Sequence, residues 1–241
     1  MIINPVTETI TIGELSLNVQ IERTNRKKTI SLQVKDNKLT IKAPKAVSKK
    51  KLDELIQRKK TWIRERAIIN FEEQALRNRE FIDNEKFYFR GKAYRLSLIE
   101  GQEETVKIAE GLLVVTFIHY KPLDRKVIKK LVEDWYLSES IKILKTRTNE
   151  LAKKMKVQPS GMTVKNYISK WGSCTAHNKI SYNWRIIMAP DYIIDYLIIH
   201  ELSHIIQPNH SQDFWHHVAK YCDSFQTKRK WLRENGHRLV L

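Results

Sequence analysis

Three histidines and one glutamate stand within the eleven residues HELSHIIQPNH at positions 200–210. His200 and His204 are four residues apart, so on a helix both imidazoles project from the same face. Such a pair can hold one metal ion, and zinc is favoured because it prefers nitrogen ligands in tetrahedral geometry. Glu201 follows the first histidine, where a carboxylate can accept a proton from a water on the ion. The spacing is the HExxH arrangement, and it predicts a hydrolytic zinc site with Glu201 as its base.

A catalytic zinc site usually has three protein ligands and one open position, so a third ligand is needed. His210 would point away from His200 on an unbroken helix. Pro208 ends the helix, however, and a reversal of the chain can bring His210 back to the metal. His210 is therefore the predicted third ligand, although it could instead only cap the next helix. The alternative is Glu234, since some zinc peptidases use a glutamate. Three further histidines are weaker candidates for the third ligand than Glu234: His216, His217 and His237.

The residues around this motif must form the elements that position it. A helix is predicted over APDYIIDYLIIHELSHIIQP, with Asp191 as its N-cap and Pro208 as its end. Ser211 is the predicted N-cap of the next helix, SQDFWHHVAKYC. Two predicted strands, MTVKNYIS and KISYNWRIIM, precede the first of these helices in the chain. The segment KWGSCTAHN joins them. Cys174 in that joining segment could bind the metal, or it could be a small buried residue.

The strand KISYNWRIIM has two different faces, because side chains alternate along a strand. One face is expected to carry Ile180, Tyr182, Trp184 and Ile186. Zinc peptidases often hold an extended substrate against an edge strand by main-chain pairing, and this strand is a candidate for that role. The alternative is a strand that simply packs on the helix. The sequence identifies no donor for the oxyanion, and the candidates are Tyr182, His217 and Tyr221.

The first half of the chain has the alternating pattern of β-strands, in LSLNVQIER, KTISLQVKDNKLTIKAP and FYFRGKAYRLSLIE. VKDNKLT is typical of a hairpin turn. Between these strands, one long helix that begins after the N-cap Ser48 is predicted over SKKKLDELIQRKKTWIRERAIINFEEQALRN. A second helical pattern runs from Leu123 to about Met155. No internal repeat is recognisable in the sequence.

The formal net charge of the 241 residues is +17, from 44 Lys and Arg against 27 Asp and Glu. Between Arg23 and Arg66 there are 16 basic and 4 acidic residues. This basic region could simply be a solubilising surface, or it could contact nucleic acid or an acidic protein partner. No apolar run approaches the roughly 18 residues of a membrane span, so no membrane association is expected. The N-terminus lacks a signal-peptide pattern and two cysteines are too few for a disulfide framework, which favours the cytoplasm.

The segments HELSHIIQPNHSQDFW and KWGSCTAHNKISYNWRI together resemble the YgjP-like metallopeptidase family, which is related to the SprT-like zinc peptidases. That family's pattern is HELxH, a short gap and NHSxxFW, preceded by a WGSC element. The resemblance covers roughly residues 165–220. It implies zinc bound by His200, His204 and His210, with Glu201 as the catalytic base. The matching positions are His200, Glu201, Leu202, His204, Asn209, His210, Ser211, Phe214 and Trp215, with Trp171, Gly172, Ser173 and Cys174 upstream.

These observations predict an α+β protein. Residues 1–120 are expected to form a basic, β-rich N-terminal region with one long helix. Residues 121–241 are expected to form a zincin-like metallopeptidase domain, in which the HExxH helix packs on a small sheet. The boundary is placed where short strands give way to long helices.

The expected activity is hydrolysis of peptide bonds in a protein or peptide substrate, through a water on Zn²⁺ that Glu201 activates. One alternative is a nucleic-acid-associated binding protein with a zinc site, and another is a peptidase recruited to nucleic-acid-bound proteins. A closed structural zinc site would need four protein ligands, whereas the motif offers three and a glutamate suited to catalysis.

Overall fold

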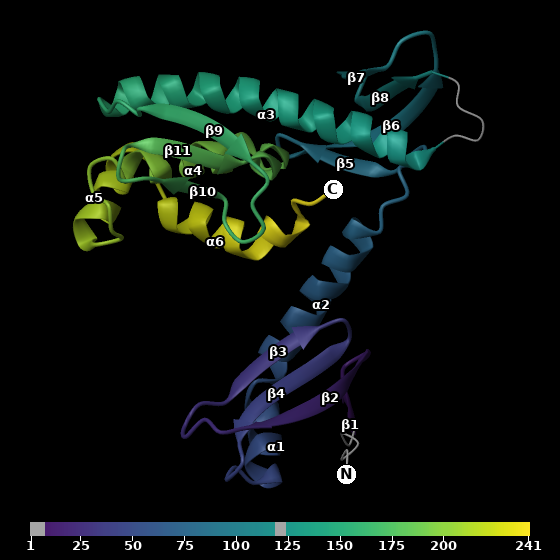
Figure 1. The fold of residues 1–241 in the computed structure, drawn as a ribbon, viewed down its shortest axis with the longest axis vertical. Coiled ribbons are helices and arrows are strands. Elements are labelled where there is room, and N and C mark those ends of the chain that lie inside the picture. The colour runs from purple at the N-terminus through teal and green to yellow at the C-terminus, as the bar shows by residue number, and fades with distance from the viewer. Residues whose placement is uncertain (1–7, 119–123) are drawn as a thin grey trace. The chain divides into compact units, whose positions relative to one another are not determined.

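The computed structural model describes residues 8–118 and 124–241, and its fold is drawn in Figure 1. The chain divides into two compact units, Met1–Asn78 and Arg79–Leu241. Each unit has its own hydrophobic core. This division lies elsewhere than the predicted boundary between residues 120 and 121. Compactness does not by itself identify the catalytic domain, so the assignment of the metallopeptidase domain to residues 121–241 stays a prediction.

The first unit is a four-stranded sheet with two helices on one face. Its strands lie in the order β1-β2-β4-β3, with β2 and β4 parallel and both outer pairs antiparallel. Alternation along the strands buries Leu17 and Leu39 in a core that includes Leu52 and Ile63 of the helices. The elements are β1 (Glu8–Ile12), β2 (Leu15–Thr24), β3 (Ser31–Lys35), β4 (Lys38–Pro44), α1 (Lys49–Arg58) and α2 (Lys60–Arg77).

Two local predictions in this unit are confirmed and one is wrong. Asp36 and Asn37 have positive φ in the hairpin turn between β3 and β4, the backbone that this turn type requires. The Ser48 side chain accepts a hydrogen bond from the Lys51 N–H and caps α1. The predicted single long helix is interrupted at Lys59, whose φ of −101° and ψ of 9° are not helical.

The second unit contains two sheets. Strands β5 to β8 form one, in the order β5-β6-β8-β7, and strands β9 to β11 form the other, in the order β10-β11-β9. Its elements are β5 (Lys86–Phe89), β6 (Lys92–Glu100), β7 (Thr105–Ala109), β8 (Leu112–Phe117), α3 (Arg125–Met155), β9 (Gly161–Lys165), β10 (Gly172–Cys174), β11 (Lys179–Asn183), a 3-10 turn (Trp184–Met188), α4 (Asp191–Ser203), α5 (Gln212–Tyr221), α6 (Phe225–Asn235) and a short 3-10 turn (Gly236–Arg238).

The two four-stranded sheets have the same connectivity. In each, an antiparallel hairpin is followed by a second hairpin, and the two inner strands pair in parallel. A helix follows the last strand of each sheet, α1 in the first unit and α3 in the second. The fold therefore contains a repeated arrangement that the sequence did not reveal, because the two copies share strand order rather than recognisable residues.

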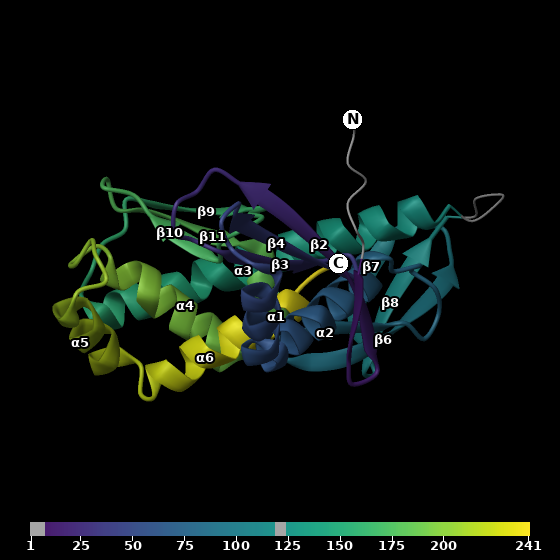
Figure 2. The ribbon, with the colours of Figure 1, turned by 90° about the horizontal axis from the view of Figure 1, so that it is seen from below.

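The α+β class and a small sheet beside the HExxH helix are confirmed. Helices α3 and α4 lie on one face of the three-stranded sheet, as Figure 2 shows, and α4 also contacts β10. The predicted strand KISYNWRIIM is shorter than expected, because it ends at Asn183 and Trp184 begins a 3-10 turn. Strand β11 is also central, with β10 on one side and β9 on the other. It is therefore not an edge strand, and the prediction that a substrate pairs with it is wrong.

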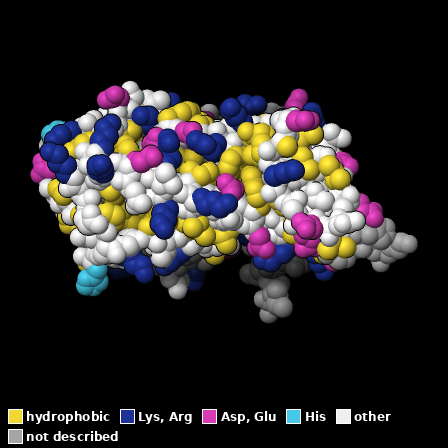
Figure 3. All heavy atoms as spheres, turned by 90° about the horizontal axis from the view of Figure 1, so that it is seen from above, with side chains coloured by type: hydrophobic (Ala, Val, Ile, Leu, Met, Phe, Trp, Pro, Cys, Tyr) yellow, Lys and Arg dark blue, Asp and Glu magenta, His cyan; other side chains and the backbone are white. Residues whose placement is uncertain are grey.

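Within residues 8–118 and 124–241, no helix is both long enough and apolar enough to span a membrane. On the face drawn in Figure 3, the described Lys and Arg side chains are interspersed with acidic and apolar ones, so that face carries no continuous basic patch.

Candidate active site

Helix α4 carries the first part of the motif and is apolar on nearly every side. Its buried residues include Leu197, Ile198 and Leu202, which pack in the core of the second unit. The helix starts after Pro190, so the prediction that Asp191 is its N-cap is wrong. The Asp191 carboxylate instead accepts two hydrogen bonds from the Arg90 guanidinium, at 2.8 and 2.7 Å.

The end of α4 turns the chain back toward the motif. Regular helix stops at Ser203, five residues before Pro208, because the next N–H groups bond to carbonyls three residues back. The prediction that the helix runs to Pro208 is therefore wrong. Ser211 caps α5 by accepting a hydrogen bond from the Phe214 N–H, as predicted. His210 lies between the two helices on this reversed segment.

His200, His204 and His210, here called the histidine cluster, come together in space. One ring nitrogen from each lies within 4.8 Å of the other two, and no other described residue belongs to the group. The Nε2 atoms of His200 and His210 are 3.0 Å apart. Three imidazoles, from α4, from its C-cap residue and from the segment before α5, thus converge, as the sequence predicted.

The hydrogen bonds of the histidine cluster leave nitrogen atoms free for a metal. The Nδ1 of His204 is 3.2 Å from the Gln207 carbonyl oxygen, to which its N–H donates, and this leaves Nε2 as the lone-pair atom. The Nδ1 of His200 is buried and has no hydrogen-bond partner among the described residues. Burial, together with the nearby His204, His210 and Arg229 charges, lowers the pKa of His200 to about 3. A neutral imidazole is the form that binds a metal.

Glu201 is the buried carboxylate of the site, with 4% of its surface exposed. Desolvation raises its pKa to about 8, and the positive charge of Lys170 opposes the shift. The carboxylate lies against Gly172 of β10, where an added Cβ would be only 2.4 Å from Glu201 Oε1. Strand β10 can approach Glu201 this closely because residue 172 has no side chain.

The other residues considered as ligands lie outside the histidine cluster. Glu234 is half exposed and pairs with Arg233 at 3.6 Å. Cys174 is partly buried, and its thiol donates to the Thr175 carbonyl at 3.5 Å. Burial and the nearby charge of Glu201 raise the pKa of the Cys174 thiol. Of the described residues, His216, His217 and His237 also lie outside the histidine cluster.

Among the candidate oxyanion donors, Tyr182 is fully buried, and the Thr148 hydroxyl donates to its oxygen at 3.2 Å. That candidate is therefore wrong. His217 and Tyr221 form an edge-on pair on α5, with ring centroids 5.3 Å apart, and stay candidates.

An aromatic wall borders the histidine cluster, and the sequence reasoning did not foresee it. Phe214 stacks on His204 with ring centroids 4.5 Å apart, and Trp215 stacks on His210 at 5.5 Å. Arg229 of α6 lies over the Trp215 ring, with its Cζ 4.7 Å from the centroid. The FW pair of the motif could have indicated the wall, but nothing in the sequence places Arg229 there.

A loop between β9 and β10 borders Glu201. Asn183 donates hydrogen bonds to the carbonyls of Tyr167 and Lys170, and its own N–H bonds to the Trp171 carbonyl. The Lys170 ammonium lies 4.5 Å from the centre of the Tyr167 ring. These bonds hold the segment leading into β10 in place, and with it Gly172.

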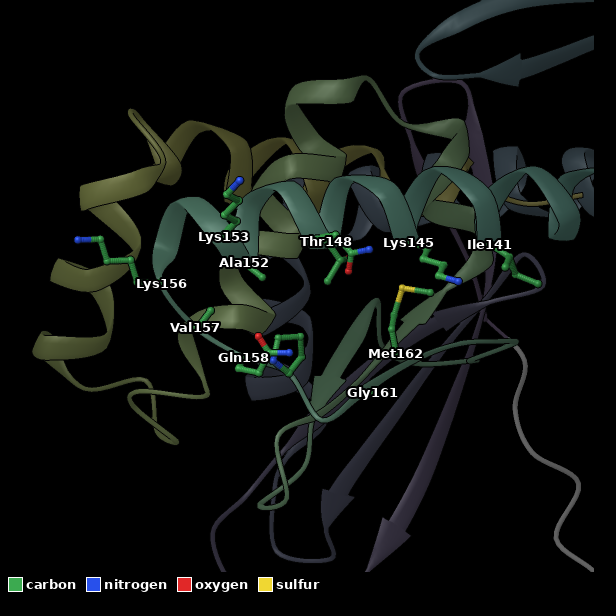
Figure 4. Close-up of a pocket in the computed structure, with 12 residues that line it drawn as sticks. Ile141, Lys145, Thr148, Ala152, Lys153, Lys156, Val157, Gln158, Gly161 and Met162 are labelled. Atoms are coloured by element: carbon green, nitrogen blue, oxygen red, sulfur yellow. The ribbon is translucent and has the colours of Figure 1, made fainter.

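A groove of about 780 Å³ lies between α3 and the start of β9, as Figure 4 shows. No member of the histidine cluster lines it. In Figure 4 the side chains of Lys153 and Lys156 point away from Met162. The groove is therefore separate from the histidine cluster.

Three converging imidazoles, the first followed in the chain by a buried glutamate, are typical of metal-dependent hydrolases. The chain matches the family model described as YgjP-like, metallopeptidase domain, over residues 28–235. Because the match covers most of the chain, the protein belongs to the YgjP-like metallopeptidase family, as the sequence predicted. It is a metallopeptidase, a hydrolase of protein or peptide substrates, and its family implies a bound metal.

Comparison with curated proteins found no match. Two solved structures are similar in part. The zymogen of Pyrococcus abyssi abylysin shares 14% identity over 41% of this chain and 99% of its own, with a TM-score of 0.37. The zymogen of Methanocaldococcus jannaschii jannalysin shares 22% identity over 36% of this chain and 93% of its own, with a TM-score of 0.32. Both are described as metallopeptidase zymogens.

Proposed function

We propose that the protein hydrolyses peptide bonds at a zinc ion held by His200, His204 and His210, with Glu201 as general base. The observation that carries this proposal is the convergence of the three imidazoles within 4.8 Å, with the buried Glu201 next to His200 in the chain. Tetrahedral zinc with nitrogen ligands at about 2.0–2.1 Å requires nitrogens about 3.3 Å apart, which the histidine cluster can adopt with small side-chain movements. Nitrogen donors and a carboxylate outside the ligand set favour zinc over oxygen-seeking ions.

A zinc ion held there would lower the pKa of its water and polarise the scissile carbonyl. Glu201 accepts the proton of the attacking water and then delivers it to the leaving amine. A base must be able to hold the proton between these two steps. The position of Glu201, next to His200 on α4 and against Gly172 of β10, supports that role. Gly172 lets the carboxylate occupy its position.

Strand β10 is the proposed place for the substrate. It is an edge strand of its sheet, since β11 is its only strand neighbour among the described residues. Its first residue, Gly172, lies against Glu201. An extended peptide that pairs with the free side of β10 would run past the proposed base, with main-chain hydrogen bonds holding it.

Two expectations rest on the sequence alone. The basic region between Arg23 and Arg66 keeps nucleic acid or an acidic protein as a proposed partner, including a peptidase recruited to nucleic-acid-bound proteins. Neither the family match nor the histidine cluster supports this partner. The cytoplasmic location also stays a prediction.

The proposal is tested with two substitutions, Glu201→Gln and His210→Ala. Glu201→Gln should keep the zinc content of the unchanged protein and lower kcat by about 100- to 10,000-fold, because only the proton acceptor is lost. His210→Ala should lose most of the zinc, because one of three ligands is removed. Metal content is measured by mass spectrometry and turnover with an unstructured protein substrate. Undiminished proteolysis by Glu201→Gln would remove the base role, and full zinc content in His210→Ala would remove the third ligand.

A further inference from the structure

Arg229 stands beside the histidine cluster without taking part in it. Phe225 and Arg229 are one turn apart on α6, and both lie against the Trp215 ring. The Phe225 ring is 5.1 Å from that ring and nearly parallel to it, at 9°. Trp215 in turn stacks on His210 at 5.5 Å and 19°. One indole ring therefore connects the Arg229 guanidinium to the proposed metal site.

The charge of Arg229 is not balanced by a carboxylate. Its side chain is exposed, and it makes no ion pair with any residue in the described part of the chain. Other arginines of the unit are paired: Arg90 and Arg147 each bind an aspartate of α4 through two hydrogen bonds. One turn further along α6, Arg233 is paired with Glu234. Arg229 is thus a cation beside the site that is available to a ligand.

The position of the guanidinium over the Trp215 ring also prepares it for a carboxylate. A guanidinium that lies over an aromatic ring keeps its N–H groups in its own plane, where they can bind both oxygens of a carboxylate. Because the ring fixes the side chain, less conformational entropy is lost when that bond forms. Trp215 therefore gives Arg229 a defined place next to the histidine cluster.

We propose that Arg229 binds a carboxylate of the substrate within one or two residues of the scissile bond, so that the enzyme prefers acidic substrates. One residue of extended peptide spans about 3.3–3.6 Å, so a carboxylate this close to the bond can reach the wall beside His210. The carboxylate comes either from an Asp or Glu side chain or from the free C-terminus of the substrate. This inference rests on the proposed peptidase function of the same site.

The test measures binding separately from hydrolysis. The zinc-loaded Glu201→Gln protein is titrated with short fluorescein-labelled peptides of Ala, Ser and Leu, and fluorescence anisotropy gives Kd. One series carries a single Asp at each position in turn, and its partner series carries Asn. A further pair has the same neutral sequence with a free or an amidated C-terminus. The two comparisons distinguish a side-chain carboxylate from the chain terminus.

We expect one acidic peptide, or the free-acid form, to bind roughly 3- to 10-fold more tightly than its neutral partner. Adding Arg229→Gln should bring that ratio to about one. Adding Arg233→Gln, an exposed arginine of the same helix, should leave the ratio unchanged. The same ratio should appear in kcat/KM of the protein that retains Glu201.

Two results would overturn the proposal. The first is equal binding of acidic and neutral peptides in the Glu201→Gln protein at every position and at the C-terminus. The second is an Arg229→Gln variant that weakens all peptides alike and keeps their ratio, which would make Arg229 only a brace for Trp215. Failure of the peptidase function is distinguishable from both, because it would abolish hydrolysis by the protein with Glu201 without changing the ratio of Kd values.

Discussion

Gly172 shows how a single residue controls the position of the proposed base. An added Cβ would lie 2.4 Å from Oε1 and 2.7 Å from Cδ of Glu201, closer than real Cβ contacts come. The Glu201 carboxylate fills the space that a side chain at residue 172 would need. The WGSC element resembles its family pattern in the sequence, and the structure supplies a physical reason for the glycine in it.

Gly172→Ala should therefore displace the Glu201 side chain. A misplacement of about 1 Å at a catalytic group can cost about 100-fold in rate, so kcat/KM should fall by roughly that factor. Zinc content should not change, because the histidine cluster is on other elements. Gly161→Ala in β9 is the matched control, since the nearest atom to its added Cβ is 4.0 Å away. Equal kcat/KM in the two variants would contradict this account.

At the scale of elements, α4 is fixed by two arginines from other parts of its unit. Arg90, just after β5, binds Asp191 in the first turn of the helix, and Arg147 of α3 binds Asp195 one turn later. Both pairs are bidentate, with N–O distances of 2.7–2.8 Å. They orient the helix that presents His200 and Glu201, while its apolar residues supply the burial.

The Arg90–Asp191 pair should make part of the stability depend on pH. The hydrogen bonds from Arg90 lower the pKa of the Asp191 carboxyl in the folded protein, so folding favours the charged carboxylate. The contribution of this pair to stability is complete at pH values above the unfolded-state pKa of about 3.9. It is lost as the pH falls through the lower pKa of the folded state. Asp191→Asn should lower the free energy of unfolding by about 0.5–1 kcal/mol at pH 7, a small value because the pair is part-exposed.

Urea unfolding at pH 7 and at pH 2–3 measures this difference. The gap between Asp191→Asn and the unchanged protein should shrink at the lower pH. A gap of the same size at both pH values would show that the charge of Asp191 is not what stabilises the folded state.

At the scale of the whole molecule, the chain has two separate cores. The first unit buries residues such as Leu39 and Ile41. The second buries residues such as Leu144 and Tyr182 and contains the histidine cluster. Both units use the same four-stranded connectivity, but only the second adds the three-stranded sheet and the helices of the site.

Separate cores predict separate unfolding transitions. Leu39→Ala and Leu144→Ala should each cost about 2–5 kcal/mol, because both side chains are fully buried, and each should shift a different transition in calorimetry. A chelator should lower only the transition that Leu144→Ala shifts, since metal binding stabilises the unit that holds it. A single transition that both substitutions move would contradict this prediction.

The local features of the protein could be predicted from the sequence. The spacing of His200, Glu201 and His204 places them on neighbouring positions of one helix, and Ser48 and Ser211 are caps by their own chemistry. The return of His210 was predicted from Pro208, but the helix already ends at Ser203, five residues earlier, and the chain turns back from there. These features depend on bonds between residues close together in the chain, which one sequence segment determines by itself.

Only the tertiary structure decided which strands lie at edges and which side chains meet across the fold. Strand β11 was expected to receive substrate but is central, and β10 beside Glu201 is the edge. The sequence also did not predict three further features. These are the repeated sheet connectivity, the interruption of the first helix and the place of Arg229 over Trp215. Pairing order and packing depend on contacts between segments far apart in the chain, and the period of apolar residues along one segment does not specify its partner.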